Sequence, residues 1–368
     1  METNTLPEFV ERDPDVIMAE SKARLEELLG REIRPAQFEQ LMLNLVVYAE
    51  VRLLNRFNAG MAQMLYQFST APVLDYLAAL VAIERLPASA AGCTLRFTLV
   101  EGHGTVLIPE GTRVASRDGA AVFRVDDDVI VEPETLSVTV GATAEEVGEA
   151  GNGYAAGDIC VILDPLAFVS EAANTDLTGG GSDVESDEQL RERIRLAPSQ
   201  YSSAGSRASY EFYAKSANAL VTDVSVTSPL PGTVQIVPLT AEETTPEQVI
   251  EDIYAACSAE RVRPLTDTVI VASPERQDYT IAVDVTLYEN TSAAEQRAEI
   301  EARLTAYAAE KRAALGLDII RSHIAQRCRL ESVYDVSVTS PAGNIVIDEG
   351  QFPYCTGITV NIIGFNRG

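Results

Sequence analysis

The sequence predicts an α+β protein of several domains: an N-terminal helical region, a small antiparallel β domain, and a C-terminal α+β region with a duplicated α-β-β unit. Three observations support this fold class. Apolar residues recur at helical spacing as far as Arg85, the period changes to two after Gly92, and the seven residues 223–229 recur as residues 335–341. A chain of 368 residues is also long enough to bury several cores.

The N-terminal region, residues 1–91, is predicted to form helices over residues 15–29, 37–58 and 73–85. Gly30 stands where the first helix should end, because glycine readily adopts the left-handed conformation that closes a helix. The second helix is apolar on most of its faces, whereas an ordinary surface helix needs only one apolar stripe. Such a helix must be covered by its own chain or by another chain, and the sequence leaves both arrangements open.

If another chain covers the second helix, its apolar positions form the interface. The candidate interface residues are Leu41, Leu45, Val46 and Tyr48. The surrounding apolar stretch, residues 41–54, is interrupted by Asn44, Glu50 and Arg52. It is therefore far short of the roughly 18 apolar residues that a membrane span needs, and a protein partner is the better expectation.

Residues 92–176 are predicted to form the β domain. Leu95, Phe97 and Leu99 alternate with polar residues, as they do in a strand with one buried face. Further short runs with strand character occupy residues 113–116, 121–125, 129–131, 136–140 and 159–163. Glycine and proline residues separate these runs, and this even punctuation is typical of a small antiparallel domain.

The C-terminal region is predicted to hold two α+β units, residues 177–265 and 266–368. Each copy of the seven-residue repeat follows a predicted helix, 206–219 in the first unit and 318–330 in the second, and precedes a further β run. A duplicated α-β-β element explains this shared order better than chance recurrence of a strand that ends in Ser-Pro. The offset between the copies is too long for a solenoid repeat, which spans about 20–50 residues.

Helix start signals support these units. Ser186 with Gln189 forms a capping box, in which the serine hydroxyl and the glutamine side chain bond to backbone N–H groups at the helix start. Thr245, Pro246 and Gln248 are interpreted in the same way, with the threonine as cap and the proline at the first helical position.

Charge and cysteine content restrict the partners and the compartment. The 55 acidic residues against 28 Lys and Arg give a net charge of −27, so phosphate backbones and anionic lipids would be repelled. Neither nucleic acid nor membrane is therefore expected as a partner. The first residues lack the basic and apolar runs of a signal peptide. Five scattered cysteines without a CxxC pair suit reduced thiols, so we expect synthesis in a cytoplasm.

Residues with catalytic or ligand-binding potential are few. Of the two histidines, His103 lies in a Gly-His-Gly turn and His323 lies in a predicted helix, so neither a catalytic triad nor an HExxH zinc site can be built. Asp126, Asp127 and Asp128 could face a cation, but consecutive acids between strands favour a solvated turn. No phosphate-binding loop motif occurs. We therefore predict no catalytic, cofactor-binding or metal-binding residues, and no enzymatic activity.

Several segments, in their order along the chain, resemble the baseplate J-like family. They are residues 76–92, the Ile-Pro-Glu-Gly-Thr run at 108–112, Gly151-Asn-Gly153, the block 179–194, and Ser203-Ala-Gly-Ser206 with Tyr210. The Glu-Ser-x-x-x-Leu-Arg-x-Arg pattern that begins at Glu185 is the most specific part. The resemblance runs from about residue 70 to 240 and more loosely to the C-terminus. The length suggests the Mu-like or myophage branch, whereas the N-terminal residues match only in being helical.

This resemblance implies a structural subunit of a contractile phage tail or a related injection machine. Family members form baseplate wedges, in which two J-like copies join one smaller wedge protein through an N-terminal helical bundle. Neighbouring wedges then meet through C-terminal domains and close a ring around the tail hub, next to sheath-initiating proteins. The resemblance therefore places the protein in the virion tail baseplate after its synthesis in the host cytoplasm.

Two other functions remain open from the residues alone. Carboxylates are abundant enough for a glycan hydrolase of a tail, which would need a cleft with two acids about 5–10 Å apart, one of them with a raised pKa. An adhesive module is the third alternative, although the chain has no tryptophan and only 6% aromatic residues.

Overall fold

The computed structural model describes residues 6–202, 205–242, 244–260, 262–264, 266–289 and 291–367. The chain divides into two compact units. The first contains the residues up to Arg85 together with Ser186–Arg195, and the second contains Leu86–Glu185 together with Leu196–Gly368. The division into four domains predicted from the sequence stays a prediction.

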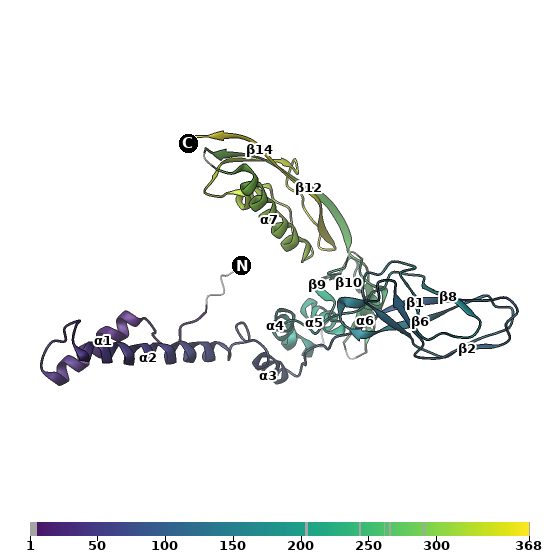
Figure 1. Ribbon diagram of the computed structural model, residues 1–368, viewed down its shortest axis with the longest axis horizontal. Helices are drawn as coiled ribbons and strands as arrows, with labels where there is room; N and C mark the ends of the chain where they lie inside the picture. Colours follow the sequence, from purple (N-terminus) through teal and green to yellow (C-terminus); the bar gives the residue numbers. More distant parts are fainter. Residues whose placement is uncertain are drawn as a thin grey trace. The chain divides into compact units, whose positions relative to one another are not determined.

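The first unit is helical (Figure 1). Its helices are α1 (Pro14–Leu29), α2 (Phe38–Ala62), α3 (Val73–Leu80) and α4 (Asp187–Leu196). Asp13 caps α1 by accepting a hydrogen bond from the backbone N–H of Asp15, and Gly30 closes the helix with a φ of 64°. Helices α1 and α2 pack side by side through Ile17, Leu43 and Val47. The predicted α1 and its glycine stop are thus present.

Residues 90–174 form a nearly closed antiparallel sheet in the second unit. Its strands are β1 (Ala90–Leu99), β3 (Arg113–Ser116), β4 (Val122–Val125), β6 (Ser137–Val147), β7 (Ile159–Ile162) and β8 (Val169–Asn174), in the order β7-β3-β4-β6-β1-β8. The edge strands β7 and β8 approach each other, so the sheet curls into a barrel. A two-stranded ribbon of β2 (Val106–Ile108) and β5 (Val129–Val131) completes its core.

The inward residues of β1 match the predicted alternation, since Leu95, Phe97 and Leu99 are all buried in the barrel core. The sequence pattern missed β2 and β8. The β2 run has only three residues, and β8 reads Val-Ser-Glu-Ala-Ala-Asn, which has little β propensity of its own. Pairing with β1 makes β8 a strand, and that pairing is a tertiary effect.

Two α+β layers follow the barrel. The first has helices α5 (Arg207–Ala217) and α6 (Glu247–Ser258) beside the strands β9 (Val221–Thr227), β10 (Thr233–Thr240) and β11 (Thr268–Val271), ordered β11-β10-β9. The second has helices α7 (Ala293–Arg312) and α8 (Arg321–Cys328) beside the strands β12 (Glu275–Tyr288), β13 (Val333–Ser340) and β14 (Gln351–Asn366), ordered β13-β12-β14. In Figure 1, α7 lies against one face of the second sheet. The mixed α+β fold class predicted from the sequence is confirmed.

The two copies of the repeat begin on β9 and β13 and end just after these strands. Each copy follows a helix and precedes a further strand, as the duplication predicts. The pairing nevertheless differs between the two copies. Strand β9 pairs antiparallel with the strand that follows it, β10, whereas β13 pairs antiparallel with β12, and β14 joins β12 in parallel. The two copies therefore share the order helix, strand, strand, but their strands pair in different ways.

Two local predictions were wrong. Helix α3 ends at Leu80 rather than at Arg85, because Ala82 adopts a φ of 60° that no α-helix accommodates. Helix α6 begins at Glu247, so Pro246 is its N-cap rather than its first residue. The Thr245 hydroxyl does not cap this helix and instead donates to the carbonyl oxygen of Pro238.

Candidate partner-binding surface

Helix α2 has one stripe that its own chain covers. Leu43 and Val47 face Ile17 of α1, and Val51 and Leu54 extend this contact along the helix. Further along the same stripe, Asn58 is buried and accepts hydrogen bonds from the backbone N–H groups of residues 9 and 10. Helix α1 therefore occupies a single face of α2, and among the described residues of the first unit the opposite face stays exposed.

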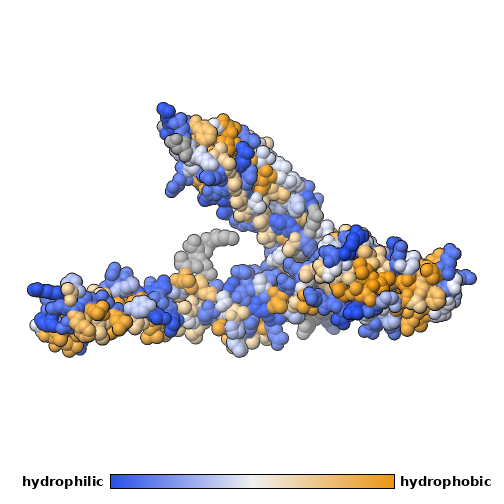
Figure 2. Space-filling view, in the orientation of Figure 1, coloured by the Kyte–Doolittle hydropathy of each residue, from blue (hydrophilic) through white to orange (hydrophobic). Residues whose placement is uncertain are grey.

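The uncovered face carries the predicted interface residues. The exposed fractions are 65% for Leu41, 61% for Leu45, 54% for Val46 and 59% for Tyr48. At 100° per residue, Leu41, Leu45 and Tyr48 form a stripe roughly opposite Leu43 and Val47. Other exposed apolar side chains extend it: Phe38, Met42, Leu53 and Phe57. We call these eight exposed residues the α2 surface, and Figure 2 shows apolar residues gathered on this part of the chain.

The middle of the α2 surface, Leu41 to Tyr48, is free of charge, whereas Glu39, Glu50, Arg52 and Arg56 lie along its two ends. No acidic or basic residue lies between Glu39 and Glu50, although the chain as a whole carries a net charge of −27. The guanidinium of Arg52 lies 5.6 Å from the centre of the Tyr48 ring, so a basic group lies beside one end of this uncharged stretch. An exposed apolar stripe with an uncharged middle, set in an acidic protein, is typical of a protein-binding surface.

The block that carries the family resemblance holds the α3 segment in place. In this block Leu190 is fully buried, the Arg191 guanidinium donates to the Ser69 carbonyl oxygen at 2.8 Å, and Arg193 donates to that of Glu84 at 3.1 Å. The Ser186–Gln189 capping box predicted from the sequence is present at the start of α4. The arginines of this motif thus serve as structural donors to loop carbonyls.

An ion-pair cluster in the same region links α3 to α4 through Arg85. The Arg85 guanidinium contacts a carboxylate oxygen of Asp75 and one of Asp187, each at 2.8 Å. Burial by itself would raise the pKa of Asp187. The hydrogen bonds from Arg85 and from the backbone N–H of Ala71, together with the charges of Arg85 and Arg191, outweigh burial and keep that pKa below its ordinary value. We call these three residues the Arg85 cluster.

Two residues with catalytic or metal-binding potential in the sequence, His103 and Asp128, form hydrogen bonds within the fold. His103 is buried, with Nδ1 2.6 Å from the Gly104 carbonyl oxygen and Nε2 3.0 Å from that of Thr135. Asp128 accepts a hydrogen bond from the backbone N–H of Glu110 in the turn beside it. Within the part of the chain that the structure describes, no three His, Cys, Asp or Glu residues are grouped to hold a metal ion. No helix in the same part is both long and apolar enough to span a bilayer.

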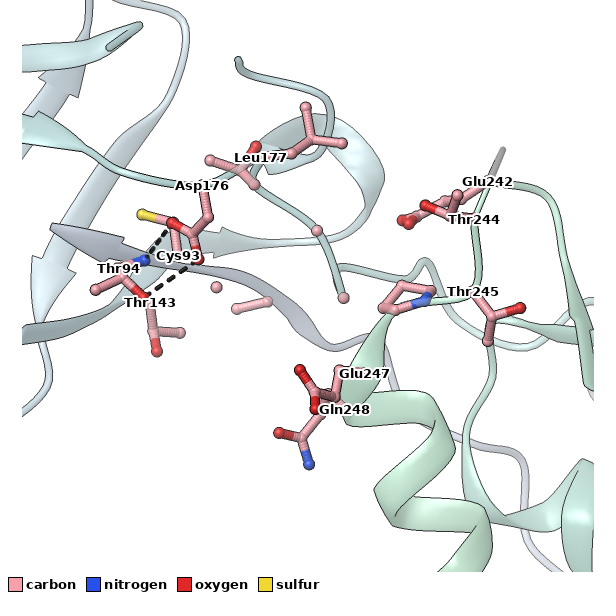
Figure 3. A pocket seen from close by; sticks show the side chains of 16 residues that line it. Cys93, Thr94, Thr143, Asp176, Leu177, Glu242, Thr244, Thr245, Glu247 and Gln248 are labelled. Atoms are coloured by element: carbon pink, nitrogen blue, oxygen red, sulfur yellow. Dashed lines mark hydrogen bonds between the residues drawn. The ribbon is translucent and has the colours of Figure 1, made fainter. Parts of the chain in front are cut away.

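A cavity of about 600 Å³ lies in the second unit, between the barrel and the segment before α6 (Figure 3). Its wall includes Cys93, Asp176 and Glu242. Burial, followed by the nearby carboxylates, raises the pKa of the Cys93 thiol to about 12, so the thiol stays protonated at neutral pH and is a poor nucleophile. Asp176 accepts hydrogen bonds from the Thr94 backbone N–H and hydroxyl. Burial also raises the pKa of Glu242, partly offset by a hydrogen bond from Gly180 N–H.

Comparison with known proteins supplies the family. The family description "Baseplate J-like protein barrel domain" matches residues 94–181, "Baseplate J-like central domain" matches residues 202–273, and "Baseplate J-like protein C-terminal domain" matches residues 279–361. Baseplate protein J of Escherichia phage P2 is 34% identical over 175 residues. That match covers 47% of this chain and 58% of the relative.

A solved structure of the anti-feeding prophage baseplate contains a chain with 12% sequence identity and a TM-score of 0.41, over 93% of this chain and 92% of that one. The three consecutive family matches and the phage P2 relative agree with the order of barrel, central and C-terminal layers described above. The chain belongs to the baseplate J-like protein family.

Proposed function

We propose that this protein is a non-enzymatic structural subunit of the baseplate wedge of a contractile phage tail or a related injection machine. The observation that carries the proposal is the α2 surface, an exposed apolar stripe with an uncharged middle, on a helix whose opposite face is already packed against α1. A helix with apolar residues on both faces is stable in water only when a second layer covers it. Membership of the baseplate J-like family supports the structural role.

The proposed occupants of the α2 surface are helices of a second copy of this chain and of a smaller wedge protein. Leu41, Leu45, Val46 and Tyr48 would then lie at the centre of a helical bundle. The C-terminal layers would contact neighbouring wedges, so that the wedges close a ring around the tail hub and sheath-initiating proteins. Ring closure requires that one contact recurs around the axis, which suits a subunit with separate N-terminal and C-terminal contact surfaces.

Co-expression with the neighbouring tail genes tests the proposal. The expected product is a complex that contains two copies of this chain and one of a smaller protein, measured by native mass spectrometry. A monodisperse monomer in the presence of all tail partners would contradict it.

Leu45→Asp tests the surface directly. A buried, unpaired carboxylate at the centre of a helical bundle is strongly unfavourable, so the variant is expected to prevent wedge assembly and to leave the barrel folded. The matched control is Leu230→Asp, which places the same charge on a side chain of similar exposure, 66%, in the turn between β9 and β10. Normal wedge assembly in Leu45→Asp, or an equal loss of assembly in Leu230→Asp, would contradict the placement of Leu45 in the helical bundle.

The cavity beside Glu242 bears on the hydrolase alternative. It contains a carboxyl group with a raised pKa and two further acids, Asp176 and Glu247, which is the combination that a glycan hydrolase needs. The hydrogen bonds from Thr94 to Asp176 argue for a structural role of that carboxylate. If the purified chain cleaves cell-envelope glycans and Glu242→Gln abolishes the cleavage, the enzymatic alternative replaces the structural one.

A further inference from the structure

One end of the barrel carries exposed apolar side chains that the proposed wedge contacts do not include. They form two cross-strand pairs. Leu107 lies opposite Ile130 where β2 pairs with β5, and their exposed fractions are 50% and 64%. Val100 and Phe168, which are 44% and 53% exposed, are neighbours because the Val100 backbone N–H donates to the Phe168 carbonyl oxygen at 3.0 Å. We call these four residues the barrel tip, and Figure 1 labels β2, the strand that carries Leu107.

A buried imidazole joins the two loops beside the barrel tip. The His103 side chain is only 5% exposed, and its ring nitrogens lie 2.6 Å from the Gly104 carbonyl oxygen and 3.0 Å from that of Thr135. Gly104 precedes β2 and Thr135 follows β5, so one side chain connects both ends of the ribbon that carries Leu107 and Ile130. The ribbon is therefore fixed to the barrel by a buried polar contact as well as by its apolar core.

Backbone strain is concentrated at the same end of the barrel. In the described part of the chain three non-glycine residues have a positive φ, and two of them are Glu134 at 74° and Phe168 at 69°. Glu134 is the third residue of a turn that the Thr135 N–H closes on the Glu132 carbonyl oxygen at 3.2 Å, a position where glycine is favoured. Side chains keep this conformation only where their surroundings hold it, and such residues gather at binding sites. The barrel tip is thus presented by loops of fixed shape.

The charges around the barrel tip all have one sign. The segments that carry it, residues 100–112, 125–137 and 163–171, contain nine Asp and Glu residues and no Lys or Arg. All of these acids are exposed except Asp164, which is ion-paired with Arg113. A second copy of the same tip, an anionic lipid and a nucleic acid would therefore be repelled. A partner that covers the apolar pairs has to bring positive charge with it.

We propose that the barrel tip binds a segment of a different protein in which apolar side chains are flanked by Lys and Arg. The apolar side chains cover the two cross-strand pairs, and the basic residues face the acids beside them, such as Glu101, Glu132 and Glu134. An apolar centre with complementary charges around it is the usual organisation of a protein–protein interface. This contact goes beyond the proposed wedge function, which uses the α2 surface and the C-terminal layers, and it does not depend on that function.

Two labelled peptides test the proposal on the full chain, with fluorescence anisotropy as the measurement. They are Lys-Lys-Leu-Phe-Leu-Lys-Lys and Lys-Lys-Ser-Ser-Ser-Lys-Lys, which have the same charge but differ in their centres. Ile130→Ser should weaken binding of the first peptide by about tenfold and of the second by less than about twofold, because only an apolar centre gains from covering Ile130. The matched control is Val147→Ser, which should change neither. Val147 is 62% exposed, lies at the other end of β6 and follows two acids, Glu145 and Glu146.

A third peptide, Glu-Glu-Leu-Phe-Leu-Glu-Glu, tests the charge requirement and should bind at least about tenfold more weakly than its Lys counterpart. Hydrogen exchange locates the contact, since the Lys-Leu peptide should protect amides of residues 100–108 and 128–136 but not those of residues 143–149.

Three results would reduce the contact to general attraction between a basic peptide and an acidic protein, and each overturns the proposal. They are unchanged binding in Ile130→Ser, an equal loss in Val147→Ser, and equally tight binding of the Ser-centred peptide. Cosedimentation of the full chain with phosphatidylcholine vesicles, abolished by Ile130→Ser, would assign the barrel tip to a lipid surface and overturn the proposal as well.

Discussion

Single arginine side chains determine how the α3 segment is held. Arg191 and Arg193 donate to backbone carbonyl oxygens, and Arg85 bridges two carboxylates. A planar guanidinium suits both tasks because it presents several N–H donors in a fixed geometry, which lysine cannot do. The two arginines of the Glu-Ser-x-x-x-Leu-Arg-x-Arg pattern therefore have a structural role in the fold.

Arg85→Met tests this structural role. The substitution keeps much of the apolar stem but leaves Asp75 and Asp187 without their shared partner, so exchange of the α3 and α4 amides should become about tenfold faster. Hydrogen exchange with mass spectrometry measures it. Arg96→Met is the control, because Arg96 is exposed on β1. Equal exchange in wild type and Arg85→Met would show that the Arg85 cluster contributes nothing to local stability.

Asp164 gives a pH-dependent contact on the barrel. Its carboxylate accepts hydrogen bonds from the Arg113 side chain at 2.8 and 2.9 Å, and these, with one from the Arg113 backbone, lower its pKa to about 2. A lowered folded-state pKa means that the contribution to stability is complete above the ordinary value of 3.8 and disappears as the pH falls toward 2. Thermal unfolding of the barrel should therefore lose less stability between pH 5 and pH 2 in Asp164→Asn than in wild type. An identical pH dependence in both would contradict this.

At the scale of elements, the sequence predicts the main helices and most of the barrel strands, including short ones such as β3 and β7. Periodicity located α1, α2 and β1 because their own residues define a buried face. It could not locate β8, which becomes a strand only by pairing with β1, nor the partner of β13, which depends on contacts far away in the chain. For the same reason it identified α2 as apolar on most faces but could not say which face α1 would cover.

Paired substitutions on α2 separate its two faces. Leu43 is 6% exposed and packs against α1, so Leu43→Ala should weaken that packing by about 2–3 kcal/mol through lost burial and an added cavity. Leu41 is 65% exposed, so Leu41→Ala should change the stability of the isolated chain by less than about 0.5 kcal/mol. Hydrogen exchange of the α1 amides measures the packing of α1 against α2 in both variants. Only Leu41→Ala should weaken wedge assembly without changing that exchange. Comparable exchange in the two variants would mean that the faces are assigned wrongly.

At the scale of the whole molecule, net charge controls association. A charge of −27 keeps separate copies soluble and makes their approach unfavourable at long range. The middle of the α2 surface, Leu41 to Tyr48, is uncharged, so the proposed contact is mainly apolar, while the repulsion comes from the rest of the surface. Salt should therefore act mainly on the repulsion.

Self-association is consequently expected to strengthen as salt rises from about 0.02 M to about 0.3 M. Over that range the screening length falls from about 20 Å to about 6 Å, so repulsion between two acidic copies fades while apolar burial remains. Sedimentation equilibrium of the full chain at both salt concentrations measures the effect. Dissociation by salt would instead mean that ion pairs dominate the contact, and the α2 surface would lose its assigned role.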